Sequence, residues 1–361
     1  MKFLRKISAP IAALTIGASV LAAPVSDASV GKPTPDIVVR DKSTITEDSR
    51  DWRQETADND RVLHVDAWSD SMERNIPVAI ITPDGTFNES RPTIYMLNGA
   101  GGAEQNLDWI TSAPIVDFYE DKNVNVVIPM EGAFSYYMNW ADESPEPGNG
   151  YLEGKQLWET FLLHELPQDI EYFMNANGKR GIGGYSMSAT SSLLLAEKAE
   201  QGFFDVAGSF SGCAETASPL GYTTAQLTVD RAGVTAAQML GPMGSPHNVA
   251  NDALINAEGL RGTELYISNA TGLAGEWDMP GYYIDQGYDP NAASAGAGTL
   301  IVEGGIIEAT TNICTHNLKA KLDKLGIPAD WNLRPTGTHS WNYWIDDLEK
   351  SWPTFARALN V

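Results

Sequence analysis

GGYSMSA, residues 183–189, spans the end of a strand-like apolar run and the beginning of a helical pattern. A serine at such a corner, with small residues two positions before and after it, is typical of a nucleophile elbow, in which a strained backbone presents the hydroxyl. Gly184 and Ser188 are small enough for Ser186 to occupy that position, although the second of them is more often glycine. The same residues also fit a close-packed strand-to-helix turn. Motifs elsewhere in the chain are therefore needed to distinguish the two interpretations.

Apolar runs of strand length recur along the chain on both sides of this corner. They are Val62–Trp68, Ile76–Thr82, Thr93–Leu97, Val124–Met130, Gly181–Tyr185, Val206–Phe210, Thr263–Ser268 and Trp331–Arg334. The helical patterns between or after the later runs are Leu157–Met174, Ala189–Lys198, Thr310–Lys324 and Asn342–Leu359. The first two runs are too close together for a crossover helix. We therefore predict an α/β domain whose mixed, mostly parallel sheet carries helices on both faces. Gly-, Ala- and Pro-rich insertions at 212–262 and 270–305 are expected to build a binding cleft.

The order of further motifs matches an α/β-hydrolase fold, which needs an oxyanion-hole loop, then the nucleophile, an acid, and a histidine before the last helix. IYMLNGAGG, residues 94–102, ends a strand with a glycine-rich turn whose N–H groups could face an oxyanion, although an ordinary tight turn looks the same. RPTGTHSWNYW, residues 334–344, places His339 on the loop before the last helix. The remaining histidines fall on strand, helix or insertion positions that favour packing or surface roles: His64, His164, His247 and His316.

The acid cannot be chosen from spacing alone. Four carboxylates follow the strand that ends at Ser268: Glu276, Asp278, Glu303 and Glu308. A solvated surface carboxylate is the alternative interpretation for any one of them.

The first 28 residues have the layout of a secretory signal peptide, because Lys2, Arg5 and Lys6 precede a short apolar run and then small residues. Cleavage is expected between Ala22 and Ala28. An uncleaved membrane anchor is the alternative, but the apolar run is short for a span.

After this leader, residues 29–60 are polar with little apolar periodicity, which predicts a partly disordered N-terminal arm, and residues 61–361 are expected to form the catalytic domain. The formal net charge of −23 argues against binding nucleic acid or an anionic membrane by bulk electrostatics. A protein that is secreted or held in the cell envelope is therefore expected.

The chain has only two cysteines, Cys213 and Cys314, which excludes a disulfide-dense scaffold and a four-cysteine zinc site. In an exported chain the two most simply pair, and two buried free thiols are the alternative. None of the five histidines has a metal-ligand spacing, so we expect neither a metal nor another cofactor.

Five segments spanning nearly the whole domain carry a resemblance to a known family: SMERNIPVAI (71–80), IYMLNG (94–99), LWETFLLHELP (157–167), GGYSMS (183–188) and GTHSWNYW (337–344). They resemble the mycoloyltransferases of the antigen 85 type, in particular the secreted corynebacterial type, within the esterase D-like branch of the α/β-hydrolases. The resemblance implies a Ser-His-Glu triad with Ser186 as nucleophile and His339 as base. Glu308, in GGIIEATTNI, matches the family's acid because it opens a helix at nearly the family's distance before the histidine.

The same resemblance implies that the backbone N–H groups of Ala100 and Met187 form the oxyanion hole and that Trp341 lines the cleft. Family members that acylate trehalose carry an aspartate and an arginine around the oxyanion turn, where this chain has Asn98 and Gly101. Asn98 could still hydrogen-bond a sugar hydroxyl as a substrate-binding residue, whereas Gly101 offers no side chain. The acceptor therefore stays open.

The implied function is transfer of a mycolyl or other long-chain acyl group from trehalose monomycolate, through an acyl-enzyme on Ser186, to a hydroxyl acceptor. The implied partners are trehalose mycolate glycolipids and, as further acceptors, arabinogalactan or a serine of a porin, and not nucleic acid. Two alternatives remain: a secreted carboxylesterase or thioesterase with the same residues, and an inactive wall-associated binding protein of the same fold.

Overall fold

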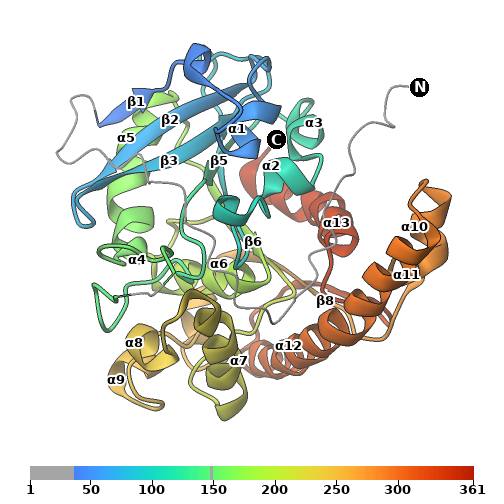
Figure 1. Ribbon diagram of the computed structural model, residues 1–361. Coiled ribbons are helices and arrows are strands. Elements are labelled where there is room, and N and C mark those ends of the chain that lie inside the picture. The colour runs from blue at the N-terminus through green and yellow to red at the C-terminus, as the bar shows by residue number, and fades with distance from the viewer. Residues whose placement is uncertain (1–35, 147–148) are drawn as a thin grey trace.

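The computed structural model describes residues 36–146 and 149–361, which fold around one nine-stranded sheet (Figure 1). The strands are β1 (Ile37–Val39), β2 (Val62–Ser69), β3 (Arg74–Ile81), β4 (Thr93–Leu97), β5 (Asn125–Pro129), β6 (Arg180–Tyr185), β7 (Val206–Phe210), β8 (Glu264–Asn269) and β9 (Asp330–Leu333). Their order is β1-β2-β3-β5-β4-β6-β7-β8-β9. The pairs β1–β2, β2–β3 and β3–β5 are antiparallel, and the other pairs are parallel. The predicted mixed, mostly parallel sheet is confirmed, and every predicted strand is present with its ends shifted by at most two residues.

The centre of the sheet consists of short strands that are buried on both faces. Every residue of β4, β5 and β7 is buried, as expected for strands that helices cover on both sides. β4 lies between β5 and β6, so successive connections run in opposite directions from it. The carboxyl ends of β4 and β6 meet at this switch point, where Leu97 pairs with Gly184. Open α/β sheets bind their ligands at such a point.

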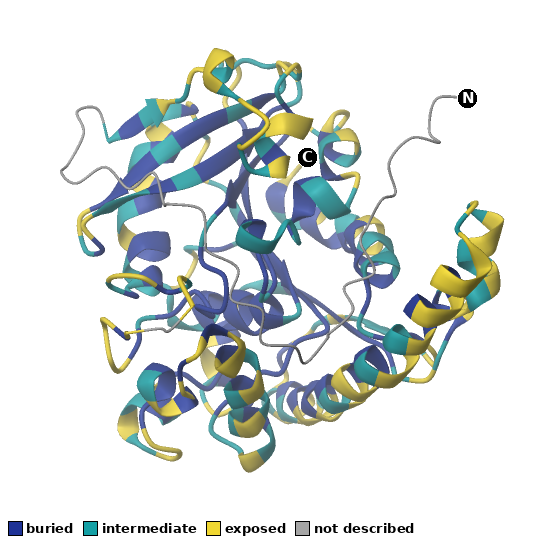
Figure 2. Cartoon of the chain, in the orientation of Figure 1, coloured by how far each residue is buried: buried dark blue, intermediate teal, exposed yellow. Residues whose placement is uncertain are grey.

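Alternate residues of β4 contribute to two hydrophobic clusters, because successive side chains of a strand point to opposite faces. Tyr95 and Leu97 belong to one cluster, and Ile94 and Met96 to the other. The helices that complete the first cluster are α5 (Leu166–Phe173), α6 (Met187–Lys198) and α12 (Gly305–Leu325). Those of the second are α2 (Trp109–Ser112), α3 (Ile115–Tyr119) and α13 (Trp341–Leu359). Helices therefore cover both faces, and Figure 2 shows the buried sheet between them.

The described part of the predicted N-terminal arm packs against the sheet. β1, of three residues, pairs antiparallel with β2, and Trp52 of α1 (Asp51–Glu55) is only 1% exposed. The ordered fold thus begins before the boundary predicted at residue 61, because a short strand and one anchoring aromatic give no long apolar run. The predicted signal peptide, residues 1–28, lies outside the described residues.

Both Gly-, Ala- and Pro-rich insertions are largely helical. The first contains α7 (Pro219–Val229), α8 (Ala236–Leu240) and α9 (Pro246–Ala250), and the second contains α10 (Pro280–Asp285), α11 (Pro290–Thr299) and a π-helical turn (Leu300–Gly304). The π turn joins α11 to α12, and Figure 1 shows these helices running outward from the body of the molecule to α10 at the tip. The predicted helix at 157–174 consists of α4 (Trp158–Thr160), another π turn (Phe161–Glu165) and α5. In the two described stretches, no helix has the length and apolarity of a membrane span.

A disulfide joins Cys213 to Cys314. It confirms the predicted pairing and excludes the alternative of two free thiols. Cys213 follows β7, and Cys314 lies in α12. The bond therefore ties α12 to the carboxyl end of the sheet.

Candidate active site

Ser186 occupies a sharp corner between β6 and α6. Its φ of 57° and ψ of −123° lie in a region that non-glycine residues rarely adopt. A Cβ on Gly184 would lie 2.5 Å from the carbonyl oxygen of Ser188, so the position two residues before the corner must be glycine. Ser188 accepts a hydrogen bond from the Tyr185 N–H at 3.1 Å and donates one to the Leu97 carbonyl at 2.9 Å. The corner is thus a nucleophile elbow braced against the end of β4.

His339 lies on the loop between β9 and α13 and contacts Ser186. The Ser186 hydroxyl lies 2.7 Å from His339 Nε2, and His339 Nδ1 lies 2.8 Å from Glu308 Oε2. Because a carboxylate only accepts, Nδ1–H donates to Glu308 and Nε2 is left to accept the serine proton. The rings of His339 and Trp344 form a T-shaped pair with their centroids 4.9 Å apart, and the His339 N–H donates to the Gly304 carbonyl at 3.2 Å. These contacts fix both the tautomer and the orientation of the ring.

Glu308 is completely buried in the first turn of α12. Its Oε1 accepts hydrogen bonds from Ser211 Oγ at 2.9 Å, Asn269 Nδ2 at 2.8 Å and the Ala270 N–H at 2.7 Å. With His339, four donors surround this one side chain. A buried anion needs such partners, because an unpaired charge in the interior is very costly.

Of the four carboxylates that the sequence left open, Glu308 is the one that contacts His339. Asp278 is also fully buried, but it accepts from Thr338 Oγ1 and Tyr343 Oη, each at 2.6 Å. It therefore holds the loop on which His339 lies. Burial, and then the hydrogen bond to Asp278, raise the pKa of Tyr343, so the phenol stays a neutral donor. Glu276 is exposed, and Glu303 is half-buried in the π turn.

The two residues predicted for the oxyanion hole lie in the turns that follow β4 and β6. Met187 is the first residue of α6, where backbone N–H groups lack a partner within the helix. Ala100 lies in the turn after β4, and its carbonyl accepts from the Phe134 N–H at 2.8 Å. The pairing of β4 with β6 brings both turns to the same edge of the sheet. Neither N–H donates to a backbone carbonyl anywhere in residues 36–146 and 149–361, so both are available to a ligand.

The structure does not place Asn98 where it could hold a sugar. Asn98 is 1% exposed, its Nδ2 donates to the Pro129 carbonyl at 3.0 Å, and its Oδ1 accepts from the Trp109 N–H at 3.1 Å. This differs from the predicted substrate contact, because both polar atoms already have protein partners. Asn98 instead fastens the end of β4 to the end of β5 and to the start of α2.

Trp341 is half-buried at the start of α13 and packs against Tyr185, the residue before Ser186 in the elbow. Its ring lies 4.6 Å from that of Tyr185 and 5.7 Å from that of Trp109. Burial raises the pKa of Tyr185, whose hydroxyl donates to the Leu107 carbonyl at 2.6 Å. Trp341 therefore helps to fix the residue that precedes Ser186, and it is not among the residues that line the pocket described next.

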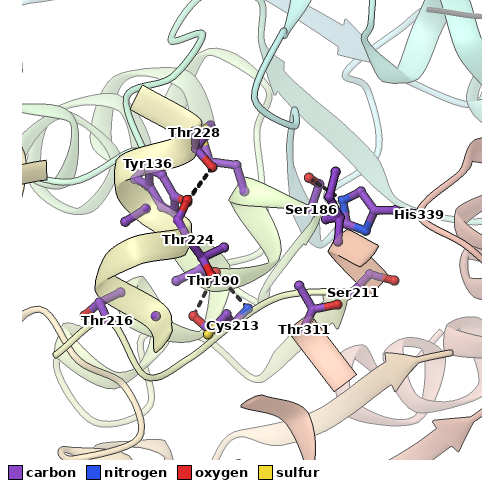
Figure 3. A pocket seen from close by; sticks show the side chains of 14 residues that line it. Tyr136, Ser186, Thr190, Ser211, Cys213, Thr216, Thr224, Thr228, Thr311 and His339 are labelled. Atoms are coloured by element: carbon purple, nitrogen blue, oxygen red, sulfur yellow. Dashed lines mark hydrogen bonds between the residues drawn. The ribbon is translucent and has the colours of Figure 1, made fainter. Parts of the chain in front are cut away.

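A pocket opens from Ser186 and His339 toward α7 (Figure 3). Figure 3 shows Thr224 and Thr228 of α7, together with Tyr136, on the side opposite Ser186 and His339. Tyr136 donates to Thr228 at 3.2 Å, and burial raises the pKa of Tyr136 to about 12. The other lining residues are Met187, Thr190, Ser211, Cys213, Thr216, Gly221, Ala225, Ile307 and Thr311. The pocket thus has a lining rich in threonine, with Met187, Ala225 and Ile307 as apolar members.

Sequence reasoning missed the residues that hold Glu308 and those of α7 that wall the pocket. Ser211 and Asn269 stand directly at the carboxyl ends of the neighbouring strands β7 and β8. Because ligands and functional groups gather at that edge of a parallel sheet, polar residues there could have been selected. The α7 threonines carry no such signal in the sequence.

Comparison with known proteins shows which family the chain resembles along most of its length. A family model described as "Putative esterase" matches residues 69–355. The chain is 29% identical over 295 residues to the diacylglycerol acyltransferase/mycolyltransferase Ag85A of Mycobacterium tuberculosis (strain ATCC 25618 / H37Rv), covering 81% of this chain and 80% of that protein. It is 26% identical over 275 residues to Ag85C of Mycobacterium leprae (strain TN), a protein with the same descriptive name, covering 74% of each.

Solved structures share the fold at lower identity. The crystal structure of Mycobacterium tuberculosis MPT51 superposes with a TM-score of 0.64 at 20% identity, over 81% of this chain and 96% of that one. A Staphylococcus aureus fluorophosphonate-binding serine hydrolase, FphF, superposes with a TM-score of 0.55 at 15% identity, over 80% and 96%. The fold is therefore that of the α/β-hydrolases, and the resemblance to the antigen 85 proteins is confirmed. With the family match extending over most of its length, the chain belongs to the esterase family.

Proposed function

We propose that the chain is an acyltransferase that moves a long-chain acyl group, such as a mycolyl group, from an acylated trehalose to a second hydroxyl through an acyl-enzyme on Ser186. The observation that carries the proposal is the unbroken hydrogen-bond path from Ser186 through His339 to the buried Glu308. The names of the relatives support transfer as the reaction.

In the first half of the reaction, Ser186 Oγ attacks the ester carbonyl carbon while His339 Nε2 takes its proton. The N–H groups of Ala100 and Met187 donate to the oxyanion, and Glu308 stabilises the imidazolium. His339 then gives the proton to the sugar oxygen as the ester C–O bond breaks. Trehalose leaves, and the acyl group remains esterified to Ser186.

In the second half, His339 takes the proton of an acceptor hydroxyl as that oxygen attacks the acyl-enzyme, and the proton returns to Ser186 when the tetrahedral intermediate collapses. The proposed acceptors are trehalose monomycolate, arabinogalactan and a porin serine. Water in the acceptor position would give the free fatty acid instead. The signal-peptide pattern at residues 1–28 supports action outside the cell or in the cell envelope.

The test measures both products from one donor. Purified protein is incubated with a trehalose monoacylate, and trehalose diacylate and free fatty acid are separated and quantified. Ser186→Ala should lower both by roughly 10⁵–10⁶-fold and abolish labelling by a fluorophosphonate, because the nucleophile is lost. Ser43→Ala, at an exposed serine far from Ser186 in the sequence, is the control and should change neither product formation nor labelling.

Three other outcomes would contradict parts of the proposal. Fatty acid without diacylate at any acceptor concentration would show an esterase. A Ser186→Ala protein that still transfers acyl groups at the wild-type rate would refute the assignment of the nucleophile. An unlabelled wild-type protein without turnover would favour a binding protein of the same fold.

A further inference from the structure

The exposed apolar side chains of this protein are concentrated on one segment. Among the described residues, 14 large hydrophobic side chains are exposed, and eight of them lie between residues 273 and 313. We call these eight the arm face: Leu273, Met279, Ile284, Ile301, Val302, Ile306, Ile307 and Ile313. Five of the eight lie on the π turn and α12, and one lies on α10. Figure 2 shows that α10, α11 and the start of α12 are largely exposed. Such a concentration of exposed apolar side chains marks a contact surface.

Three strongly exposed members stand on the long helix that α11, the π turn and α12 form together. Val302 is 60% exposed, Ile306 66% and Ile313 53%. Steps of four and seven residues place side chains on the same side of a helix. This side of the helix is therefore turned away from the body of the protein, while Glu308 on another side is completely buried.

The arm face continues into the pocket. Ile307 lines the pocket with Ser186 and His339 and is itself 37% exposed. Leu273, 66% exposed, accepts through its carbonyl a hydrogen bond of 2.6 Å from the Gly337 N–H, two residues before His339. An apolar surface that begins inside the pocket and extends outside it suits a substrate whose reactive ester enters the pocket while its chains stay in an apolar phase.

The charge of the segment restricts the kind of surface it can meet. Residues 262–318 contain no lysine or arginine, whereas Glu276, Asp285 and Asp289 are exposed. Proteins that bind anionic lipid rely on clusters of basic residues, and this protein has a net charge of −23. A second copy of the chain would bring the same acidic segment against itself and cover the mouth of the pocket. An uncharged lipid surface meets neither obstacle.

We infer that the arm face docks the protein on an electrically neutral lipid surface, with the Ser186 pocket opening toward the lipid. The inference rests on the proposed function, since a lipid substrate is what makes docking useful. The arm would then hold the enzyme at the interface while the ester group of one lipid molecule reaches Ser186.

The test measures partition and chemistry separately. Vesicles of phosphatidylcholine with a trehalose monoacylate are compared with vesicles that also contain phosphatidylglycerol, and bound protein is quantified by co-sedimentation. The double variant Val302→Gln/Ile306→Gln removes two arm-face side chains and keeps residues compatible with a helix. Tyr172→Gln is the matched control, because Tyr172 is 91% exposed at the end of α5, on another part of the surface (Figure 1).

We expect the double variant to lose about 100-fold in partition to neutral vesicles, because two aliphatic side chains no longer leave water. Its turnover of the vesicle-embedded glycolipid should fall in parallel, while its hydrolysis of a soluble short-chain ester stays at the wild-type rate. Tyr172→Gln should match the wild type in all three assays. Anionic vesicles should bind the wild type more weakly than neutral ones.

Several results would overturn the inference. The double variant could bind neutral vesicles as the wild type does, or Tyr172→Gln could lose as much binding. Sedimentation could also show a wild-type dimer that the double variant dissociates, which would make a second copy the occupant. Partition is measured with Ser186→Ala protein as well, so that a failure of docking is distinguishable from a failure of the proposed chemistry.

Discussion

Replacing Glu308 by glutamine changes one atom of the site, and the structure fixes how the new amide must turn. Ser211 Oγ, Asn269 Nδ2 and the Ala270 N–H all donate to Glu308 Oε1. The amide oxygen must stay at that position, because the NH₂ group would otherwise face three donors. The NH₂ group of Glu308→Gln is therefore directed at His339 Nδ1.

This orientation reverses the tautomer of His339. An amide NH₂ only donates, so Nδ1 becomes the acceptor and the ring proton moves to Nε2. Nε2 lies 2.7 Å from Ser186 Oγ and can then no longer take the serine proton. The same tautomer error in a Ser-His-Asp enzyme costs about 10⁴-fold in kcat. At about 1.36 kcal/mol for each factor of ten, we expect the barrier to rise by about 5.4 kcal/mol.

The assay is kcat for a soluble ester near pH 7, with ¹⁵N chemical shifts of the His339 ring reporting the tautomer. Glu276→Gln is the matched control, because it makes the same change at an exposed carboxylate that the sequence could not distinguish from Glu308. It should leave kcat unchanged. A folded Glu308→Gln protein that keeps more than about a tenth of the wild-type kcat would refute the reasoning.

Two further predictions concern stability. Cys213→Ala/Cys314→Ala should lower the free energy of unfolding in urea by roughly 4–5 kcal/mol, because the disulfide closes a loop with a sequence separation of 101, and an unchanged transition midpoint would contradict this. The Thr56 hydroxyl donates to the Trp52 carbonyl, so it accepts from His64 Nε2 at 2.7 Å, and the buried His64 Nδ1 has no hydrogen-bond partner. Burial, followed by the nearby Lys42, lowers the pKa of His64 from 6.5 to about 3. Between these pH values the unfolded state binds the extra proton and the folded state does not, so the His64 contribution to stability should decline by about 1.4 kcal/mol per pH unit as the pH falls from 6.5. The difference in unfolding free energy between the wild type and His64→Gln should vary with pH in that way, and a constant difference would count against it.

The sheet could be predicted well because its central strands are buried on both faces and therefore form continuous apolar runs. β4, β5 and β7 are examples, and the predicted bounds of β4 and β7 match the structure. β1 escaped prediction because an edge strand of three residues pairs only with β2 and has only one buried residue. The insertions escaped because alanine, glycine and threonine give little periodicity, whereas proline and serine caps start several of their helices.

The part of the site that could be predicted is the part defined by the order of motifs along the chain. Ser186 and His339 stand at positions that any α/β-hydrolase topology brings to one edge of the sheet, and the structure joins them. The choice among four carboxylates depends on which helix side faces His339, and the sequence does not contain that geometry. Asn98 shows the same limit, because its partners Pro129 and Trp109 come from another strand and a helix.

One long helix carries both Glu308 of the candidate site and most residues of the arm face. Glu308 stands at the beginning of α12, directly after the π turn, and Ile306 and Ile307 of the arm face precede it. The hydrogen bonds from Ser211, Asn269 and Ala270 fix the carboxylate itself. The Cys213–Cys314 disulfide fixes the helix six residues further on, so the acid is held between its own donors and a covalent tie to the end of β7. Contacts made by α10 and α11 therefore act on the part of the helix that precedes this clamp. The hydrogen bond from the His339 N–H to the Gly304 carbonyl in the π turn is the contact that links this part of the helix to the site.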